Sequence, residues 1–513
     1  MATERRTRVR FAPSPTGPLH MGGVRTALYN YLYAKKRGGD FIIRIEDTDS
    51  QRFVPGAEAY IIEALKWCGI IPDEGVDMAT GEVVVEKSEK HPHAPYRQSQ
   101  RRGLYRAYGE QLVKAGWAYY AFDTSEELNA ARSAAEAQGQ TFIYNASTRE
   151  GLRNSLTLNT EETERLLEER TDWTIRFKMP VGRIVAMDDM IRGHVEVNTD
   201  TLDDKVLWKR ADELPTYHLA NIVDDHLMEI TEVIRGEEWL PSLPLHYLLY
   251  EAFGWTDTMP RFAHLPLLLK PVGNGKLSKR DGDKMGFPVF PLNWKNSEGE
   301  TYHGYREDGY FPEAFVNLLA MLGWNPGTEQ EMFSMEELIE AFSIEHVSKS
   351  GAKFNPDKAK WYNKEYLRTK SDEQLAVLFE PVLASHGVQA EHDYVVKVCG
   401  LIKERATFVA DFWDIASYLF VTPTSYNEKD VAKFWKEENY TLAFEIADVI
   451  AEKGVEAAEQ EIRERELPMG KIMNCIRLAL VGASSGLGIA DIVSLIGTEE
   501  FCKRIENIKK ALL

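Results

Sequence analysis

The first fifty residues alternate between short apolar runs and one longer amphipathic stretch. Residues 9–12 and 41–45 are apolar runs typical of strands. Between them, residues 22–37 carry apolar positions at helical spacing, at Val24, Ala27, Leu28, Tyr31 and Leu32. Gly38 and Gly39 end this pattern. The order predicts a βαβ unit, in which ligands bind beyond the carboxyl ends of the parallel strands.

Patterns beyond residue 104 predict an insertion into this α/β domain. Thr124 and Glu127 form a capping box before a predicted helix over residues 126–138, and residues 160–170 predict a second, highly charged helix. Three β-rich runs follow, at residues 174–179, 194–198 and 228–235. We expect the last of them to return the chain to the first sheet.

Helical patterns dominate from about residue 310 onward. Two capping boxes mark expected helix starts, Ser334 with Glu337 and Ser371 with Gln374. Helical apolar spacing runs across residues 401–419 and 472–480. Residues 286–300 contain Pro and Asn, and we expect a surface loop there.

Composition narrows the function classes. The 513 residues include 61 Lys and Arg against 80 Asp and Glu, a net charge of −19. This balance argues against wholesale nucleic-acid binding but allows a local basic track. The chain has four widely spaced cysteines, Cys68, Cys399, Cys475 and Cys502. They predict a reducing cytoplasm, with neither a disulfide scaffold nor a cysteine-built zinc site. We find no apolar run long enough for a membrane span and no apolar signal core.

The loop after the first strand reads Pro-Ser-Pro-Thr-Gly-Pro-Leu-His-Met-Gly-Gly, residues 13–23. Gly22 and Gly23 allow close backbone approach, and the helix N-terminus that follows favours anions. His20 precedes that turn and could donate to a phosphate. Taken alone, this short motif is weak evidence and favours a loop histidine that has no chemical role.

A second loop, Lys276-Leu277-Ser278-Lys279-Arg280, places three cations around one serine after a Gly-Asn-Gly turn. Such a loop suits a mobile clamp for phosphates, where positive charge counters the charge developing on leaving pyrophosphate. The alternative is a solvated basic loop.

Taken together in this order, and with Arg-Ile-Glu-Asp-Thr-Asp at residues 44–49, the two loops resemble the "HIGH" and "KMSKS" signatures of class I aminoacyl-tRNA synthetases. The form resembles the glutamyl branch. The resemblance continues through residues 217–226, 233–239 and 309–314, and is most specific over residues 8–56 and 215–280.

The resemblance implies a Rossmann-like α/β catalytic domain over residues 1–103 and 203–270. It implies an α+β acceptor-stem-binding insertion over 104–202, and a stem-contact region with the Lys-x-Ser-Lys-Arg loop over 271–369. An all-α anticodon-binding domain would occupy 370–513. The family suggests a monomer, and the cysteines and apolar runs described above predict a cytoplasmic protein without membrane contact.

The implied reaction attaches L-glutamate to tRNA(Glu) through glutamyl-adenylate, with ATP and Mg²⁺ and with tRNA bound before the first step. His20 and Lys279 would stabilise the transferring phosphate as catalytic residues. The implied ATP-binding residues are Pro13, Thr16, Gly17, His20, Gly22, Gly23, Lys276, Ser278, Lys279 and Arg280. Gly23 stands where the signature ends in histidine, as it often does in the glutamyl branch.

The family's amino-acid-binding positions correspond to Arg10, Ser14, Glu46, Tyr217, Asn221 and Arg235. Glu46 suits the substrate ammonium, while Arg10 and Arg235 suit carboxylates. Arg235 carries the specificity, because a buried arginine facing a neutral glutamine would be left uncompensated. The alternative for Arg235 is a surface ion pair with Glu237 or Glu238.

Three expectations concern tRNA and zinc. Basic and aromatic residues open the insertion and could line an acceptor-stem path or form one face of a solvated helix: Arg97, Arg101, Arg102, Arg106, Lys114, Tyr96, Tyr105 and Tyr108. Arg405 falls where the family reads the anticodon, or is a plain surface arginine. No structural zinc is expected, because residues 69–398 lack cysteine.

Four other function classes fit parts of the sequence. A glutaminyl enzyme lacks the arginine at the position of Arg235. A truncated relative that glutamylates a modified tRNA base lacks the C-terminal region, and small adenylyltransferases are shorter. A non-catalytic RNA-binding protein would not need His20 and Lys279. Whether tRNA(Gln) is also charged stays open.

Overall fold

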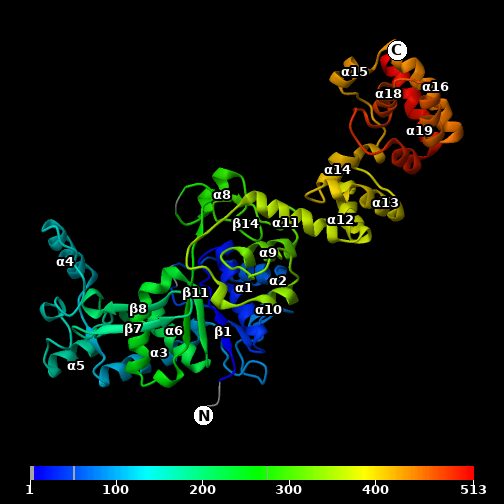
Figure 1. Cartoon of the computed structure of the whole chain (residues 1–513). Helices are drawn as coiled ribbons and strands as arrows, with labels where there is room; N and C mark the ends of the chain where they lie inside the picture. The colour runs from blue at the N-terminus through cyan, green and yellow to red at the C-terminus, as the bar shows by residue number, and fades with distance from the viewer. Residues whose placement is uncertain (1–4, 50–51, 274) are drawn as a thin grey trace. The chain divides into compact units, whose positions relative to one another are not determined.

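The computed structural model describes residues 5–49, 52–273 and 275–513. The chain divides into two compact units, Met1–Ala359 and Lys360–Leu513, which are coloured blue to yellow and yellow to red in Figure 1. The first unit is α/β, and every regular element described in the second is helical. The predicted fold class is therefore confirmed. The finer boundaries within the first unit stay predictions.

One part of the first unit is built on two sheets that adjoin along β1 and β11. Their strands, across the two sheets, are β2 (Asp40–Ile43), β1 (Arg8–Phe11), β11 (Glu232–Gly236), β12 (Arg261–Leu265), β7 (Ile184–Asp189) and β8 (Gly193–Asn198). The pairs β1–β2, β11–β12 and β12–β7 are parallel. The Thr231 amide donates to the Arg8 carbonyl at 2.9 Å, which places β11 beside β1.

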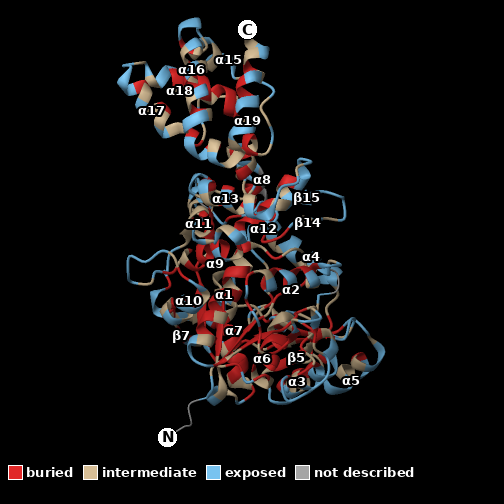
Figure 2. Ribbon diagram, turned by 90° about the vertical axis from the view of Figure 1, so that its right-hand side faces the viewer, coloured by how far each residue is buried: buried red, intermediate tan, exposed pale blue. Residues whose placement is uncertain are grey.

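Helix α1 (Met21–Lys36) connects β1 to β2, so the predicted βαβ unit is confirmed. Its face carrying Val24, Ala27 and Leu28 is fully buried. Figure 2 shows buried residues gathered around α1, α6 (Tyr217–Leu227) and α7 (Leu243–Ala252). Both α1 and α6 begin at the carboxyl ends of strands or just beyond them, where ligands bind in such sheets.

A separate antiparallel sheet is formed within residues 118–215, and β7 and β8 of the sheet described above lie in sequence between two of its strands. Its strands are β10 (Leu214–Pro215), β9 (Val206–Lys209), β6 (Thr174–Phe177) and β5 (Ala118–Ala121). Its neighbours in sequence are α3 (Arg102–Lys114), α4 (Ser125–Ala137) and α5 (Thr160–Glu169). The capping box of Thr124 with Glu127 is present at α4. Helices α4 and α5 confirm the two helices predicted in this region.

The rest of the first unit consists of short elements. They are α2 (Ala57–Trp67), β3 (Val76–Asp77), β4 (Glu82–Val83), β13 (Leu268–Leu269), α8 (Lys279–Met285), β14 (Trp294–Lys295), β15 (Thr301–Tyr302), α9 (Pro312–Met321), α10 (Met335–Ala341) and β16 (Ala352–Lys353). Helix α11 (Pro356–Thr369) runs across the unit boundary.

The second unit consists of α12 (Asp372–Ser385), α13 (His392–Ile402), α14 (Asp411–Ala416), α15 (Glu428–Phe434), α16 (Glu437–Lys453), α17 (Val455–Glu464), α18 (Met469–Val481) and α19 (Ile489–Leu512). The capping boxes at Ser334 and Ser371 are present at α10 and α12. No helix among the described residues is long and apolar enough to cross a membrane.

Three sequence expectations are wrong in part. Residues 401–419 do not form one helix, because Ala406 is extended and the Asp411 carboxylate accepts from the amides of Thr407 and Phe408, both at 2.8 Å. The strand expected from residue 228 begins at Glu232. Residues 286–300 are no plain surface loop, since they hold β14 and the buried side chains of Val289, Phe290 and Leu292.

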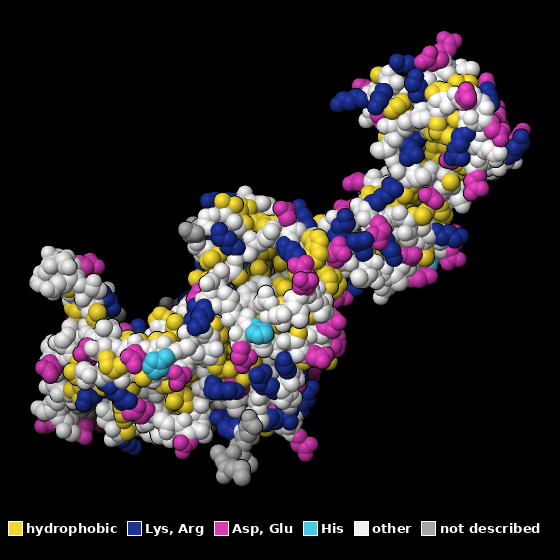
Figure 3. Space-filling model, viewed as in Figure 1, with side chains coloured by type: hydrophobic (Ala, Val, Ile, Leu, Met, Phe, Trp, Pro, Cys, Tyr) yellow, Lys and Arg dark blue, Asp and Glu magenta, His cyan; other side chains and the backbone are white. Residues whose placement is uncertain are grey.

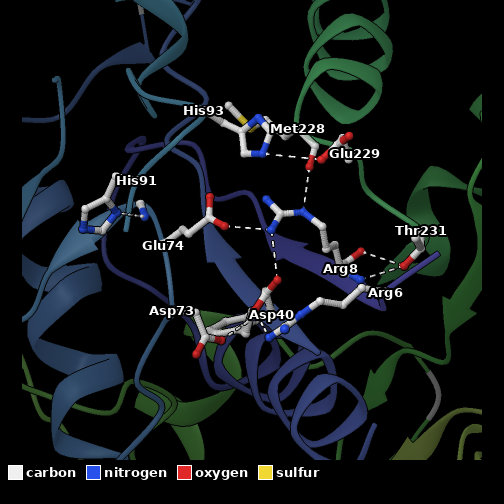
Figure 4. Close-up of polar contacts among 12 residues, drawn as sticks. Arg6, Arg8, Asp40, Asp73, Glu74, His91, His93, Met228, Glu229 and Thr231 are labelled. Carbon is white, nitrogen blue, oxygen red and sulfur yellow. Dashed lines mark hydrogen bonds and ion pairs between the residues drawn. The ribbon is translucent and has the colours of Figure 1, made fainter. Parts of the chain in front are cut away.

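An ion network holds the amino ends of the parallel strands together (Figure 4). Arg8 NH1 lies 3.0 Å from Asp40 and 2.7 Å from Glu74, and its Nε donates to the Met228 carbonyl at 3.0 Å. Buried charges of this kind persist when they are paired with opposite charges. The network ties β1 to β2 and to the end of α6, away from the carboxyl ends of the strands.

Candidate active site

His20 is the N-cap of α1, and its ring geometry fixes its protonation. Nδ1 accepts a hydrogen bond from the Gly22 amide at 3.1 Å. A neutral imidazole that accepts at one nitrogen carries its proton on the other, so Nε2 is the N–H donor. Burial, together with the nearby cation of Lys276, lowers the pKa of His20 to about 4. Nε2 is buried and has no hydrogen-bond partner among the described residues. His20 is therefore a neutral donor without an acceptor.

Residues of both signature loops line one cavity of about 450 Å³. Its lining includes His20, Gly22, Gly23, Lys276 and Ser278. Gly23 has a packing role as well, because a Cβ there would lie 2.5 Å from Leu19 Cδ1. The cavity opens at the N-terminus of α1, where the partial positive charge of the helix dipole favours anions.

Three of the other predicted ATP-binding residues, Pro13, Thr16 and Gly17, lie outside the lining of this cavity. Pro13 and Thr16 shape the preceding turn: the Pro13 carbonyl accepts from the Glu46 amide at 3.0 Å, and the Thr16 amide donates to Ser14 at 2.8 Å. Gly17 has a positive φ of 146°, which favours glycine. The side chains of Lys279 and Arg280 lie outside the described residues.

Ser278 acts first as a helix cap. Its hydroxyl donates to Asp281 at 2.5 Å, and the Asp281 carboxylate also accepts from the Ser278 amide at 2.9 Å. These bonds, led by the Ser278 hydroxyl and joined by Lys270, lower the pKa of Asp281 to about 2. The pair starts α8 at Lys279, and the sequence analysis did not identify this cap.

All six predicted amino-acid-binding residues line a second cavity of about 220 Å³: Arg10, Ser14, Glu46, Tyr217, Asn221 and Arg235. The two cavities share Gly23, Thr26, Gly236 and Glu238 in their linings, so they adjoin at the start of α1. A ligand in the smaller cavity would lie beside one held by His20.

Alternating charges form the floor of the smaller cavity. Asp225 accepts from Arg10 at 3.0 and 3.1 Å and from Arg44 at 2.7 Å, and Arg44 also donates to Glu46 at 2.9 Å. Burial raises the pKa of Glu46, against the opposing pull of Arg44 and Arg10. Asn221 donates to Glu46 at 3.3 Å, while its buried Oδ1 has no partner among the described residues. An oxygen acceptor and a carboxylate side by side suit an ammonium ligand.

Arg235 differs from Arg10 because no carboxylate that the structure describes is its hydrogen-bond partner. Its side chain donates to four neutral acceptors, namely His264 Nε2 at 3.0 Å, Tyr217 OH at 3.0 Å, His246 Nδ1 at 3.2 Å and the Trp239 carbonyl at 3.4 Å. The residue is 5% exposed and makes no ion pair with any side chain that the structure describes. A surface ion pair with Glu237 or Glu238 is thus the wrong reading, since those residues pair with Arg192 and Lys276.

The comparison with known families decides the assignment. A family model described as "tRNA synthetases class I (E and Q), catalytic domain" matches residues 6–361. The chain belongs to the class I tRNA synthetases. A second model, described as an anticodon binding domain, matches residues 374–509 of this synthetase.

Several relatives of this synthetase match at full length. The glutamate–tRNA ligase of Bacteroides thetaiotaomicron is 55% identical over 516 residues, with 99% of each chain covered. That of Flavobacterium psychrophilum is 55% identical over 512 residues, with 98% and 99% covered. A crystal structure of a glutamate tRNA ligase from Elizabethkingia meningosepticum in complex with its amino acid is 52% identical, with a TM-score of 0.93. The match covers 99% of this synthetase and 100% of that chain.

The basic track expected at the start of the insertion is wrong for its buried members. Tyr96 and Tyr105 have no exposed surface, and Arg101 and Tyr105 donate to Asp224, each at 2.8 Å. Arg101 and Tyr105 thereby fix the start of α3 against α6, and all three buried side chains are out of reach of a tRNA on the surface. The cations Arg102, Arg106 and Lys114 are exposed. Acidic and basic side chains are interspersed on the face shown in Figure 3.

Arg405 belongs to the second unit, whereas the residues that line the two cavities belong to the first. Its NH1 donates to the Gly486 carbonyl at 3.1 Å, at an exposed position. Arg477 donates to the same carbonyl at 3.4 Å.

No three His, Cys, Asp or Glu side chains of the described chain are grouped to hold a metal ion.

Sequence reasoning missed Asp225, Arg44 and the histidines around Arg235. One signal was present: Asp224 and Asp225 interrupt an apolar stretch of α6, and both are buried with paired charges. Charged residues inside an apolar helical face indicate buried ion pairs. The positions of His246 and His264 gave no such signal.

Proposed function

We propose that this synthetase attaches L-glutamate to tRNA(Glu) in an ATP-dependent reaction through glutamyl-adenylate. The family and the full-length relatives named as glutamate–tRNA ligases support this activity. The observation that carries the substrate assignment is Arg235, a buried cation whose hydrogen-bond acceptors among the described residues are all neutral. A glutamate side-chain carboxylate would supply the missing charge. A glutamine side chain would not, and mispairing of this kind discriminates by about 10⁴.

The smaller cavity offers complementary groups for each end of the substrate. Glu46 and the free Oδ1 of Asn221 would receive the ammonium, and Arg235 the side-chain carboxylate. Arg10 already shares Asp225 with Arg44, so its charge is largely compensated. Its part would be to hold the floor of the cavity and to donate from the one nitrogen that Asp225 leaves free.

In the first step, an oxygen of the glutamate α-carboxylate attacks the α-phosphorus of ATP, and the bond to pyrophosphate breaks. His20 would donate Nε2–H to the phosphate oxygens, and Lys279 would counter the charge on the leaving pyrophosphate. In the second step, a ribose hydroxyl of the tRNA attacks the acyl carbon and AMP leaves. Mg²⁺ would enter with ATP as part of the substrate and offset its charge.

Aminoacylation with purified tRNA tests this proposal. Glutamate and glutamine would each be offered with tRNA(Glu) and with tRNA(Gln). We expect glutamylation of tRNA(Glu) and no glutaminylation of either tRNA. Absence of glutamate transfer to any tRNA would overturn the proposal. Glutamylation of tRNA(Gln) would widen it to both tRNAs. Monomeric state and cytoplasmic location are predictions from the family.

A further inference from the structure

The guanidinium of Arg235 is held from behind by a buried pair, His264 and Asp189. Arg235 Nε lies 3.0 Å from His264 Nε2, and His264 Nδ1 lies 2.6 Å from Asp189 Oδ2. The side chains of both His264 and Asp189 are fully buried. They come from β12 and β7, which are neighbours in the sheet.

The chain of donors and acceptors fixes the tautomer of His264. An arginine Nε can only donate, so His264 Nε2 must accept. The ring proton therefore sits on Nδ1 and is donated to Asp189. Burial lowers the pKa of His264, which agrees with a neutral ring. Only this tautomer gives both contacts.

Asp189 cannot turn to pair with another group. Its Oδ1 accepts from the backbone amides of Ile191 at 3.0 Å, Arg192 at 2.8 Å and His264 at 3.3 Å. Its Oδ2 is left for the His264 ring. The turn between β7 and β8 thus holds the carboxylate in one orientation.

The imidazole also separates two opposite charges. If Asp189 touched Arg235 directly, the pair would be neutral and would attract a substrate carboxylate weakly. With a neutral ring between them, Arg235 is oriented by a hydrogen bond and keeps its charge for the cavity. On the other side His246 accepts from Arg235 NH1 at 3.2 Å, and its second ring nitrogen lies 3.2 Å from His218.

We propose that His264, held by Asp189, is a positioning residue that orients the uncompensated charge of Arg235 and thereby sets the preference for glutamate over glutamine. This inference rests on the proposed function of Arg235. The competing explanation is that the pair only joins β7 to β12.

Asp189→Asn tests the tautomer directly. Because Oδ1 must still accept three backbone amides, the new amide nitrogen would face His264 and donate to Nδ1. The ring proton would then move to Nε2, where it would face the N–H of Arg235 Nε. The same Asp→Asn change stabilises the wrong histidine tautomer in other Asp–His pairs. We expect the KM for glutamate to rise about ten- to hundredfold, the range for losing a hydrogen bond to a charged group. The KM for ATP should stay within about twofold.

Two substitutions of His264 separate positioning from packing. In His264→Gln the amide oxygen reaches the place of Nε2 and can accept from Arg235, whereas His264→Asn reaches only the place of Nδ1. We expect the Gln variant to retain at least tenfold more discrimination than the Asn variant, measured as the ratio of the Ki for glutamine to the KM for glutamate. If both variants lose discrimination equally, or neither does, the inference is wrong.

Two further variants of the full chain complete the experiment. Arg183→Gln removes the ion pair of Arg183 with Glu251 next to the start of β7, the strand that carries Asp189. It does not touch Arg235 and should leave discrimination unchanged.

Arg235→Cys is assayed in parallel. If it keeps the preference for glutamate, the proposed function of Arg235 fails. If it loses the preference while Asp189→Asn and the two His264 variants keep it, only the positioning inference fails. If Asp189→Asn does not fold, the comparison of His264→Gln with His264→Asn decides.

Discussion

The Nδ1 atom of His20 accepts a hydrogen bond from the Gly22 amide, and this contact leaves Nε2 as a donor that no described group satisfies. The ring is neutral because burial lowers its pKa to about 4. A neutral donor at a helix N-terminus can bind a phosphate oxygen without adding a competing proton equilibrium at neutral pH.

Two substitutions separate the two ring nitrogens of His20. His20→Asn can keep the contact with Gly22 but loses the donor at Nε2, whereas His20→Gln can keep that donor. We expect His20→Asn to lower kcat for tRNA-dependent ATP–pyrophosphate exchange by about 10²–10³-fold, the effect of removing one such donor. His20→Gln should retain more activity. An Asn variant as active as the Gln variant would show that Nε2 has no part in the first step.

Lys279 should act in the transition state rather than in substrate binding. Lys279→Ala should slow adenylate formation far more than it raises the dissociation constant of glutamate. Single-turnover kinetics with bound tRNA separate the two quantities. Lys284→Ala, an exposed lysine on the same helix, is the matched control and should change neither. Equal losses in rate and in glutamate binding would contradict the role assigned to Lys279.

Residues 287–305 connect the second signature loop to His20. The Val289 carbonyl accepts from the Met21 amide at 2.9 Å, and the Phe290 ring meets the His20 ring edge-on at 6.0 Å. Gly304 packs under this segment, and a Cβ there would lie 2.0 Å from the backbone carbon of Leu292.

Gly304→Ala should therefore displace the segment and reduce activity. We expect a loss of about 1–3 kcal/mol in the free energy of unfolding, the usual cost of overpacking, together with a lower kcat. Gly103→Ala is the control, because a Cβ there meets nothing within 4 Å. Urea unfolding and aminoacylation check both values. A Gly304→Ala variant with unchanged stability and kcat would contradict the packing described for this segment.

Buried neutral histidines should make the protein acid-sensitive. The pKa of His218 is lowered to about 4, chiefly by burial and then by Lys205 and Arg235. Between pH 6.5 and 4 the unfolded chain binds a proton that the folded chain does not, so the free energy of unfolding falls as the pH falls through this window. For one histidine the loss reaches about 3 kcal/mol.

His218→Gln should therefore flatten the pH dependence. Urea midpoints of wild type and variant, measured from pH 7.5 to 5, should converge as the pH falls. A difference between them that stays constant with pH would show that His218 does not contribute through its protonation.

Local patterns predicted much of the fold, because spacing and caps act within a few residues. The βαβ unit, α4, α5, α10 and α12 all follow from them. The break after Ile402 was missed because Asp411 stops the helix through a cap whose signal lies nine residues further on. The buried stretch around Phe290 was missed because its partners, His20 and Tyr60, are more than 200 residues away in sequence.

The site shows the same division. The six amino-acid-binding positions came from resemblance, and the structure places them around one cavity. The contacts that hold these residues in place join strands and helices that are remote in sequence. An example is Asp225 of α6, which lies between Arg10 and Arg44. No local pattern encodes such contacts. The environment of Arg235 depends on His246 and His264, which lie on two later elements of the chain, α7 and β12.

Substitution of Arg235 tests the account's central claim most directly. Aminoacylation of tRNA(Glu) by wild type and by Arg235→Cys would be measured with glutamate and glutamine, each alone and in competition. We predict that kcat/KM for glutamate falls by about 10²–10³-fold in the variant, as for loss of a buried ion pair, and that glutamine then competes. An Arg235→Cys enzyme that still prefers glutamate as strongly as wild type would contradict the claim.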